Sequence, residues 1–222
     1  MRLFGRRPLV TDDMADWILD CADWAEETGR MGRRLILPTK DDFRAPGGEG
    51  PEVARRVADD IARHMGLADR AFRVEPIDAL PAEHRHQYGQ LSAVAGQYWH
   101  DADEPLITYD PAMMARPLPF IATMAHELMH LALADAVDEV PGGDAVHELA
   151  TDLLTIFAGF GVLQMTGAAQ AGWAGYMTQD SRAWALAVFL RRTGGAPETA
   201  TPWLDPRDRT RLARALSDPR VA

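Results

Sequence analysis

The sequence predicts an α+β fold, and two kinds of pattern support this expectation. Apolar residues recur at the helical period over 11–30 and 51–66, as they do on one face of an amphipathic helix. Short runs rich in β-branched and aromatic residues at 71–77 and 96–110 favour strands. The chain has 222 residues, 47% of them hydrophobic and 25% charged, which is typical of a single globular domain over 1–222.

The first predicted helix covers 11–30. Thr11 or Asp12 would cap its start, and Gly29 lies near its end. Cys21 falls on the apolar stripe of this helix, so it is expected to be a core thiol rather than a nucleophile. Because it is the only cysteine, the chain cannot form an internal disulfide.

Shorter elements follow the first helix. The stretch 34–40 is interpreted as a strand, and 45–51 as a loop rich in glycine and proline. A second amphipathic helix is predicted over 51–66, with His64 on its polar, solvated side. A further strand is expected at 71–77.

The stretch 81–100 is rich in histidine. His84, His86 and His100 have a spacing that matches no established metal-ligand pattern. The sequence from 96 to 110 is interpreted as two strands around an acidic turn.

A third helix is predicted over 120–136, and it contains the sequence MAHELMHLAL. Pro117 and Pro119 precede it, as expected for residues before or in the first turn of a helix. Residues four apart lie on the same face, so His126 and His130 could both reach one metal ion.

The residues around these histidines favour a functional motif over a chance occurrence. The helix is apolar nearly all round, which is typical of a buried helix. Burying two histidines and Glu127 costs free energy unless they are paired or bind a metal. The alternative is a pair of core histidines with hydrogen-bond partners of their own.

A second polar pair lies on the next predicted helix, 147–161, for which Asp144 is a plausible N-cap. Glu148 and Asp152 are four residues apart, so their carboxylates repel each other unless a cation is near. A metal ion for Glu148 and an imidazole N–H for Asp152 would satisfy both. The alternative is an exposed polar edge of the helix.

Together these motifs resemble the gluzincin, or thermolysin-like, class of zinc metallopeptidases: H-E-x-x-H on one helix and E-x-x-x-D on a second. The matching residues are His126, Glu127, His130, Glu148 and Asp152. The resemblance implies one zinc ion per chain, bound by His126, His130 and Glu148. It implies that Glu127 is the catalytic general base and that Asp152 holds a ligand histidine.

The resemblance covers about 100–165 and implies a zincin-like α+β domain. A small mixed sheet would pack on the H-E-x-x-H helix, with a second helix carrying the glutamate ligand and additional N- and C-terminal helices. The active-site core would cover about 94–165 and a C-terminal helical part about 176–222. The class also has an edge strand before the first metal helix, where an extended peptide pairs; 104–110 occupies that place.

Two assignments at the site have alternatives: the third metal ligand and the residue that stabilises the oxyanion. His147 directly precedes Glu148 and could itself be the third ligand, although it points about 100° away on the helix. The class also uses a histidine or tyrosine to stabilise the oxyanion, and no motif identifies it here. The candidates are Tyr176, Tyr109 and His100, with Arg182 as another possible cation.

The C-terminal part predicts two scaffold helices, over 180–195 and 205–218. Asp180 or Ser181 would cap the first, and Asp205 the second.

Composition narrows the functional classes. The chain has 23 Lys and Arg against 33 Asp and Glu, a net charge of −10, and no basic cluster, so no nucleic-acid partner is expected. The N-terminus has no apolar stretch of signal-peptide length. The apolar stretch around 153–165 is too short to span a membrane, and 167–175 is the most linker-like segment. We therefore expect a cytoplasmic protein without a membrane partner.

The leading functional interpretation is a zinc metallopeptidase that hydrolyses peptide bonds with a metal-activated water and Glu127 as general base. Its partner would be a peptide or protein substrate. One alternative is a zincin-fold protein that binds zinc without cleaving, as a regulatory or interaction module. Others are a zinc hydrolase of a non-peptide amide and a purely structural helical domain without metal.

Overall fold

The computed structural model describes residues 8–77, 96–99, 104–172 and 175–221. Its α-helices are α1 (Asp12–Glu27), α2 (Pro51–His64), α4 (Pro117–Leu133), α5 (His147–Thr155), α6 (Gly161–Gln170), α7 (Gln179–Thr193), α8 (Pro197–Ala200) and α9 (Pro206–Leu216). The strands are β1 (Arg73–Pro76), β2 (Gly96–Trp99) and β3 (Leu106–Tyr109). The described chain is thus mainly helical with a small sheet.

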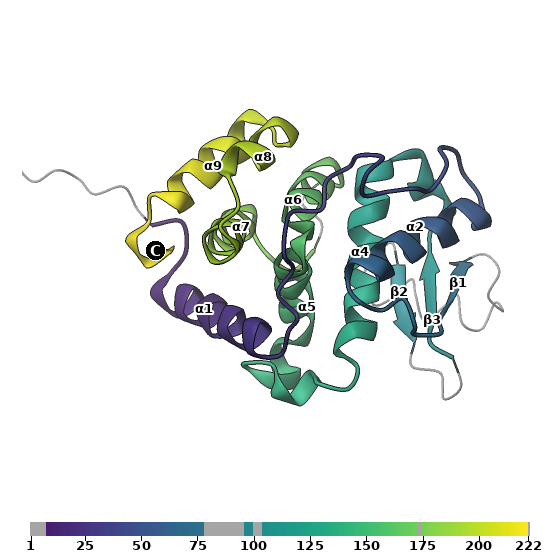
Figure 1. Cartoon of the computed structure of the whole chain (residues 1–222), viewed down its shortest axis with the longest axis horizontal. Helices are drawn as coiled ribbons and strands as arrows, with labels where there is room; N and C mark the ends of the chain where they lie inside the picture. Colours follow the sequence, from purple (N-terminus) through teal and green to yellow (C-terminus); the bar gives the residue numbers. More distant parts are fainter. Residues whose placement is uncertain (1–7, 78–95, 100–103, 173–174, 222) are drawn as a thin grey trace, which may run out of the picture.

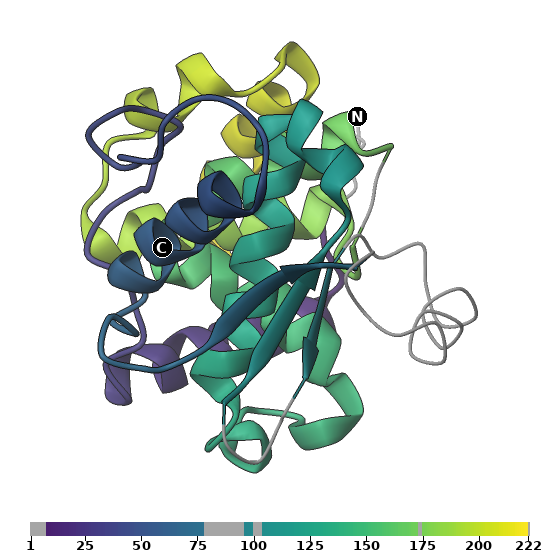
Figure 2. The same ribbon diagram turned by 90° about the vertical axis from the view of Figure 1, so that its right-hand side faces the viewer.

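The elements are stacked in layers around α4 (Figure 1). The sheet lies on one side of α4, and α5 and α6 lie on the other. Next comes α7, which packs on α6 and is covered in turn by α1 and α9. On the sheet side, α2 contacts both α4 and β1 (Figure 2). Helix α4 is therefore the central element, and its two histidines lie between layers.

The sequence explains the position of α4. Pro117 occupies its first turn, where the missing N–H of proline costs nothing. Between Pro119 and Leu133 almost every residue is buried, as the all-round apolar pattern predicts. The helix begins and ends three residues before the predicted range of 120–136.

The sheet is mixed, as expected, but the order of its strands is β1-β3-β2. Strand β3 pairs in parallel with β1, with Val74 opposite Ile107, and antiparallel with β2. The prediction that 104–110 contains an edge strand is therefore wrong. Both backbone edges of β3 are already paired, so β1 and β2 are the outer strands of the sheet formed by the described residues.

The helical run that begins at His147 continues past the predicted end at 161 to Gln170, and it is interrupted. A π-helical turn, Ile156–Phe160, separates α5 from α6, and Gly159 there has a φ of 105°. The interruption frees backbone carbonyls. The amide of Gly32 donates to the carbonyl of Phe157 at 2.7 Å, and that of Ile36 donates to Gly159 at 2.9 Å.

The segment that supplies these amides corrects another prediction. No strand forms at 34–40 in the described structure. Within this segment the amide of Ile36 bonds to the interrupted helix, at the carbonyl of Gly159, rather than to a neighbouring strand.

The run from Gly143 to Gln170 is long and apolar enough to cross a membrane by length and composition, in contrast to the short span expected around 153–165. However, 89% of its most apolar window is buried inside the protein, as in a core helix. The predicted linker 167–175 is also partly wrong, because its first four residues belong to α6.

Two predictions of helix N-caps are wrong. Helix α7 is capped by Thr178, whose hydroxyl accepts from the amide of Ser181, and not by Asp180 or Ser181. Asp144 does not cap α5, because it lies in a 3₁₀ turn that ends at Val146.

His64 is not solvated. Its Nε2 lies 2.8 Å from the carbonyl oxygen of Asp42, and its ring packs edge-on against Phe43 and Phe160. Cys21 is buried as expected, and burial with the nearby Asp20 raises the pKa of its thiol to about 12.

Candidate metal centre

Helices α4 and α5 bring the three predicted ligand residues together. The Nε2 atoms of His126 and His130 are 3.1 Å apart. Glu148 Oε2 lies 3.3 Å from the first nitrogen and 3.5 Å from the second. A tetrahedral zinc ion with bonds of about 2.0–2.1 Å places its ligand atoms about 3.3–3.4 Å apart. These three residues could therefore hold a metal ion.

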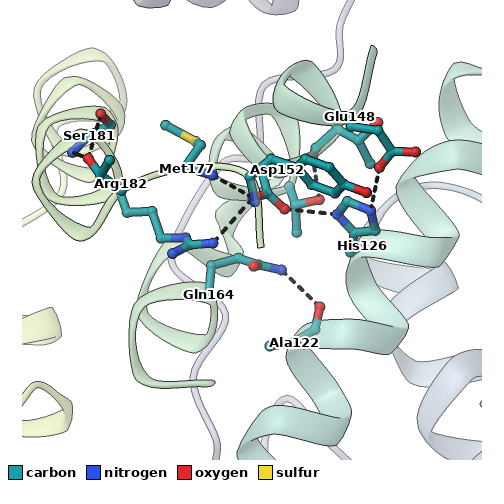
Figure 3. Close-up of polar contacts among 12 residues, drawn as sticks. Ala122, His126, Glu148, Asp152, Gln164, Met177, Ser181 and Arg182 are labelled. Carbon is teal, nitrogen blue, oxygen red and sulfur yellow. Dashed lines mark hydrogen bonds and ion pairs between the residues drawn. The ribbon is translucent and has the colours of Figure 1, made fainter. Parts of the chain in front are cut away.

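Local structure accounts for this convergence. Four residues separate the two histidines on α4, so both rings project from one face. Glu148 lies in the first turn of α5, which packs against α4. Figure 3 shows the carboxylate of Glu148 pointing to the imidazole of His126 across the gap between the helices.

The charges within the cluster are strongly coupled. Burial alone lowers the pKa of His126, but hydrogen bonds to Asp152 and Glu148 raise it to about 10. Hydrogen bonds to His126 and His130 hold the pKa of Glu148 well below its usual range. Burial lowers the pKa of His130. Without a metal, His126 therefore carries the positive charge that balances the carboxylates.

Asp152 holds His126 in place. Its Oδ1 accepts a hydrogen bond from His126 Nδ1 at 2.8 Å. Its Oδ2 accepts from the amides of Tyr176 and Met177, at 2.7 and 3.0 Å, and from Arg182 Nη2 at 3.2 Å (Figure 3). Burial raises the pKa of Asp152, but the contacts with His126 and Arg182 outweigh this and lower it. The carboxylate is thus ionised and orients the ligand histidine.

The structure separates His147 from the metal-binding group. Its Nε2 lies 2.8 Å from Nδ1 of His130, on the side of that ring opposite the metal-binding nitrogen. Among the described residues, the group that could hold a metal consists of His126, His130 and Glu148. The alternative in which His147 replaces Glu148 as a ligand does not fit this geometry.

Glu127 lies at a cavity beside the metal-binding group. The cavity has a volume of about 250 Å³ and lies between α4 and α6. Its wall includes His126, Glu127, Asp152, Gln164, Tyr176 and Arg182. Glu127 is almost fully buried and lines the same cavity as the ligand candidate His126.

The proposed oxyanion groups have different positions. The ring of Tyr176 stacks on that of His126, with centroids 6.1 Å apart and an angle of 14°. Burial, followed by the charges of Glu148 and other carboxylates, raises the pKa of its hydroxyl. Tyr109 does not line the cavity; it is buried, and its ring packs against Phe120 at 5.6 Å. His100, like His84 and His86, lies outside the described residues.

Sequence reasoning missed two residues at the site. Gln164 lines the cavity and donates to the carbonyl of Ala122 at 2.9 Å; a glutamine in an apolar helix was the available signal. Gly175, with a φ of 100°, leaves no room for a Cβ beside Asp152. Arg182 was considered as an oxyanion cation, but its guanidinium pairs with Asp152.

No protein-family model matches this chain, and neither the curated proteins nor the solved structures compared with it include a match. The structure by itself therefore gives a buried His-His-Glu group that could hold a metal ion, in a mainly helical protein.

Proposed function

We propose that the protein is a zinc-dependent metallopeptidase with a zincin-like fold. The observation that carries this proposal is the triangle of donor atoms from His126, His130 and Glu148, with Glu127 beside it at a cavity. Two nitrogens and one carboxylate oxygen form a typical ligand set for catalytic zinc, which keeps one position open. The H-E-x-x-H and E-x-x-x-D motifs give the same assignment.

When bound, zinc would polarise the scissile carbonyl and make the attacking water more acidic. Glu127 takes the proton of that water and passes it to the leaving amine nitrogen. Asp152 keeps the His126 ring oriented through the 2.8 Å contact with Nδ1. Tyr176, whose ring stacks on that of His126, would donate a hydrogen bond from its hydroxyl to the developing oxyanion.

The substrate would be a peptide or protein. Small residues line the cavity on both helices: Ala122 on α4, and Gly167 and Ala168 on α6. Strand β2 takes the peptide-pairing role first expected of 104–110, because it is an outer strand of the described sheet and packs beside α4 (Figure 1). In this proposal an extended peptide pairs by backbone hydrogen bonds with the side of β2 that faces away from β3.

The first test measures zinc per chain by elemental mass spectrometry. We expect one zinc ion in the wild type and clear loss of zinc in Glu148→Ala, because this variant removes one of three ligands. A wild type that contains no zinc after reconstitution would overturn the proposal and favour the purely structural helical domain.

The second test separates cleavage from metal binding. Glu127→Gln keeps the shape and the ligands but removes the base, so we expect zinc to be retained and peptide cleavage to fall by about 10²–10⁴-fold. Equal cleavage by the variant would refute the role of Glu127. Zinc binding without cleavage of any peptide would favour a zincin-fold regulatory or interaction module. Activity limited to non-peptide amides would favour a zinc hydrolase of such amides.

A further inference from the structure

The outer nitrogen of each ligand histidine needs a partner. A histidine that binds metal through Nε2 carries its proton on Nδ1, and a buried N–H requires an acceptor. For His126 that acceptor is Asp152. His130 is equally buried, and its Nδ1 lies 2.8 Å from the Nε2 of His147.

This contact fixes the proton positions in both rings. His130 donates from Nδ1, so His147 accepts at Nε2 and holds its own proton on Nδ1. The ring centroids are 4.8 Å apart and the rings are tilted by 47°. His147 is the first residue of α5, and the hydroxyl of Thr151 donates to its carbonyl at 2.9 Å. The ring is thus carried by the same helix that supplies Glu148.

The neutral imidazole also suits the charge balance. A divalent ion would be balanced by Glu148 and by Glu127, while Asp152 is paired with Arg182. A second carboxylate behind His130 would add a buried negative charge without a partner, which is costly. A neutral acceptor orients the ring without adding charge.

We propose that His147 is a positioning residue that acts through His130 and is not itself a metal ligand. It fixes the tautomer and the orientation of His130, so that Nε2 faces the metal. This inference rests on the proposed metal site but not on peptidase activity. Because His147 and Glu148 are neighbours, α5 supplies both a ligand and the support for a ligand from α4.

The test compares His147→Gln with His147→Leu. The amide oxygen of glutamine can accept from His130 Nδ1, whereas leucine fills similar space without an acceptor. Zinc affinity is measured by competition with a chromogenic chelator. Thermal unfolding of the zinc-free proteins serves as the control for folding. We expect a loss of about 10–100-fold in affinity for the leucine variant and recovery of most of it with glutamine.

Three other results of this comparison would overturn the inference. Wild-type affinity in His147→Leu would show that the contact does not support His130. Complete loss of zinc in both variants, as in Glu148→Ala, would make His147 a ligand. Equal partial losses in the two variants would show that the acceptor is irrelevant. A wild type without zinc would refute both this inference and the proposed function, whereas zinc binding without cleavage would refute only the peptidase.

Discussion

At the scale of single residues, the site depends on groups that hold the ligands as much as on the ligands themselves. Asp152 joins His126 to the loop before α7 and to Arg182. The loop can approach because Gly175 has no Cβ and adopts a φ of 100°. A side chain there would contact the guanidinium of Arg182 and the Oδ2 of Asp152.

Gly175→Ala should therefore disturb the metal site. We expect zinc affinity to fall by about tenfold, because the displaced carboxylate no longer orients His126. The matched control is Gly172→Ala, which has a similar positive φ of 80° but open space around the site of the Cβ. Chelator competition measures both variants. If Gly175→Ala and Gly172→Ala lose the same zinc affinity, the loss arises from backbone strain and not from displacement of Asp152.

Zinc binding should release a proton from His126. In the metal-free protein, burial lowers the pKa of His126, but hydrogen bonds to Asp152 and Glu148 outweigh burial and raise this pKa to about 10. The ring is therefore protonated at pH 7, and Nε2 must lose its proton to bind zinc. The apparent affinity for zinc should therefore rise with pH until the pH approaches the pKa of His126.

Titration calorimetry in two buffers of different ionisation enthalpy measures this release. We expect about one proton per zinc at pH 7. Release of none would show that His126 is neutral in the metal-free protein and would contradict the charge balance described for the cluster.

At the scale of elements, the interruption between α5 and α6 joins the N-terminal segment to the site. Gly159 turns the chain, and the amides of Gly32 and Ile36 satisfy the carbonyls that the turn exposes. The approach is close: a Cβ on Gly159 would lie 2.5 Å from the carbonyl oxygen of Arg34. This arrangement fixes the direction of α6, and with it one wall of the cavity.

Gly159→Ala should destabilise the protein more than an alanine at an open position. Gly66→Ala is the control, since its φ of 73° is also positive but nothing lies near its Cβ. We expect the control to lower the free energy of unfolding by about 1–2 kcal/mol. Gly159→Ala should lower it by about 3–4 kcal/mol, because backbone must also move. Urea denaturation gives both values, and similar losses would disprove the close approach.

At the scale of the whole molecule, the metal group connects two layers. His126 and His130 belong to α4, which packs on the sheet, whereas Glu148 belongs to α5 on the other side. A metal ion bound to all three would couple these layers. Folding stability would then depend on the free concentration of metal.

Removal of metal should lower the melting temperature. At a free zinc concentration of 100 times Kd, binding adds about 2.7 kcal/mol to the free energy of unfolding. Calorimetry with zinc and with chelator measures the difference. The melting temperature of Glu148→Ala should depend little on zinc. A wild-type melting temperature that does not change with zinc would argue against a metal site in the folded protein.

The sequence by itself determined the features that arise from local periodicity. Helical spacing placed His126 beside His130 and Glu148 one turn before Asp152, because four residues return to the same face of any α-helix. The apolar residues around them indicated that both helices are buried. The sequence also predicted Asp205 as an N-cap and narrowed the first cap to Thr11 or Asp12, of which the structure has Thr11, because capping involves only neighbouring residues.

The tertiary structure decided which distant groups meet. Pairing of β1 with β3 across more than thirty residues made 106–109 a central strand, and this depends on sheet assembly rather than on the strand's own pattern. Likewise, Arg182 reached Asp152 and His147 reached His130 only through the packing of α7, α5 and α4. The sequence specified each helix face, but the relative positions of those faces arise from packing between elements far apart in the chain.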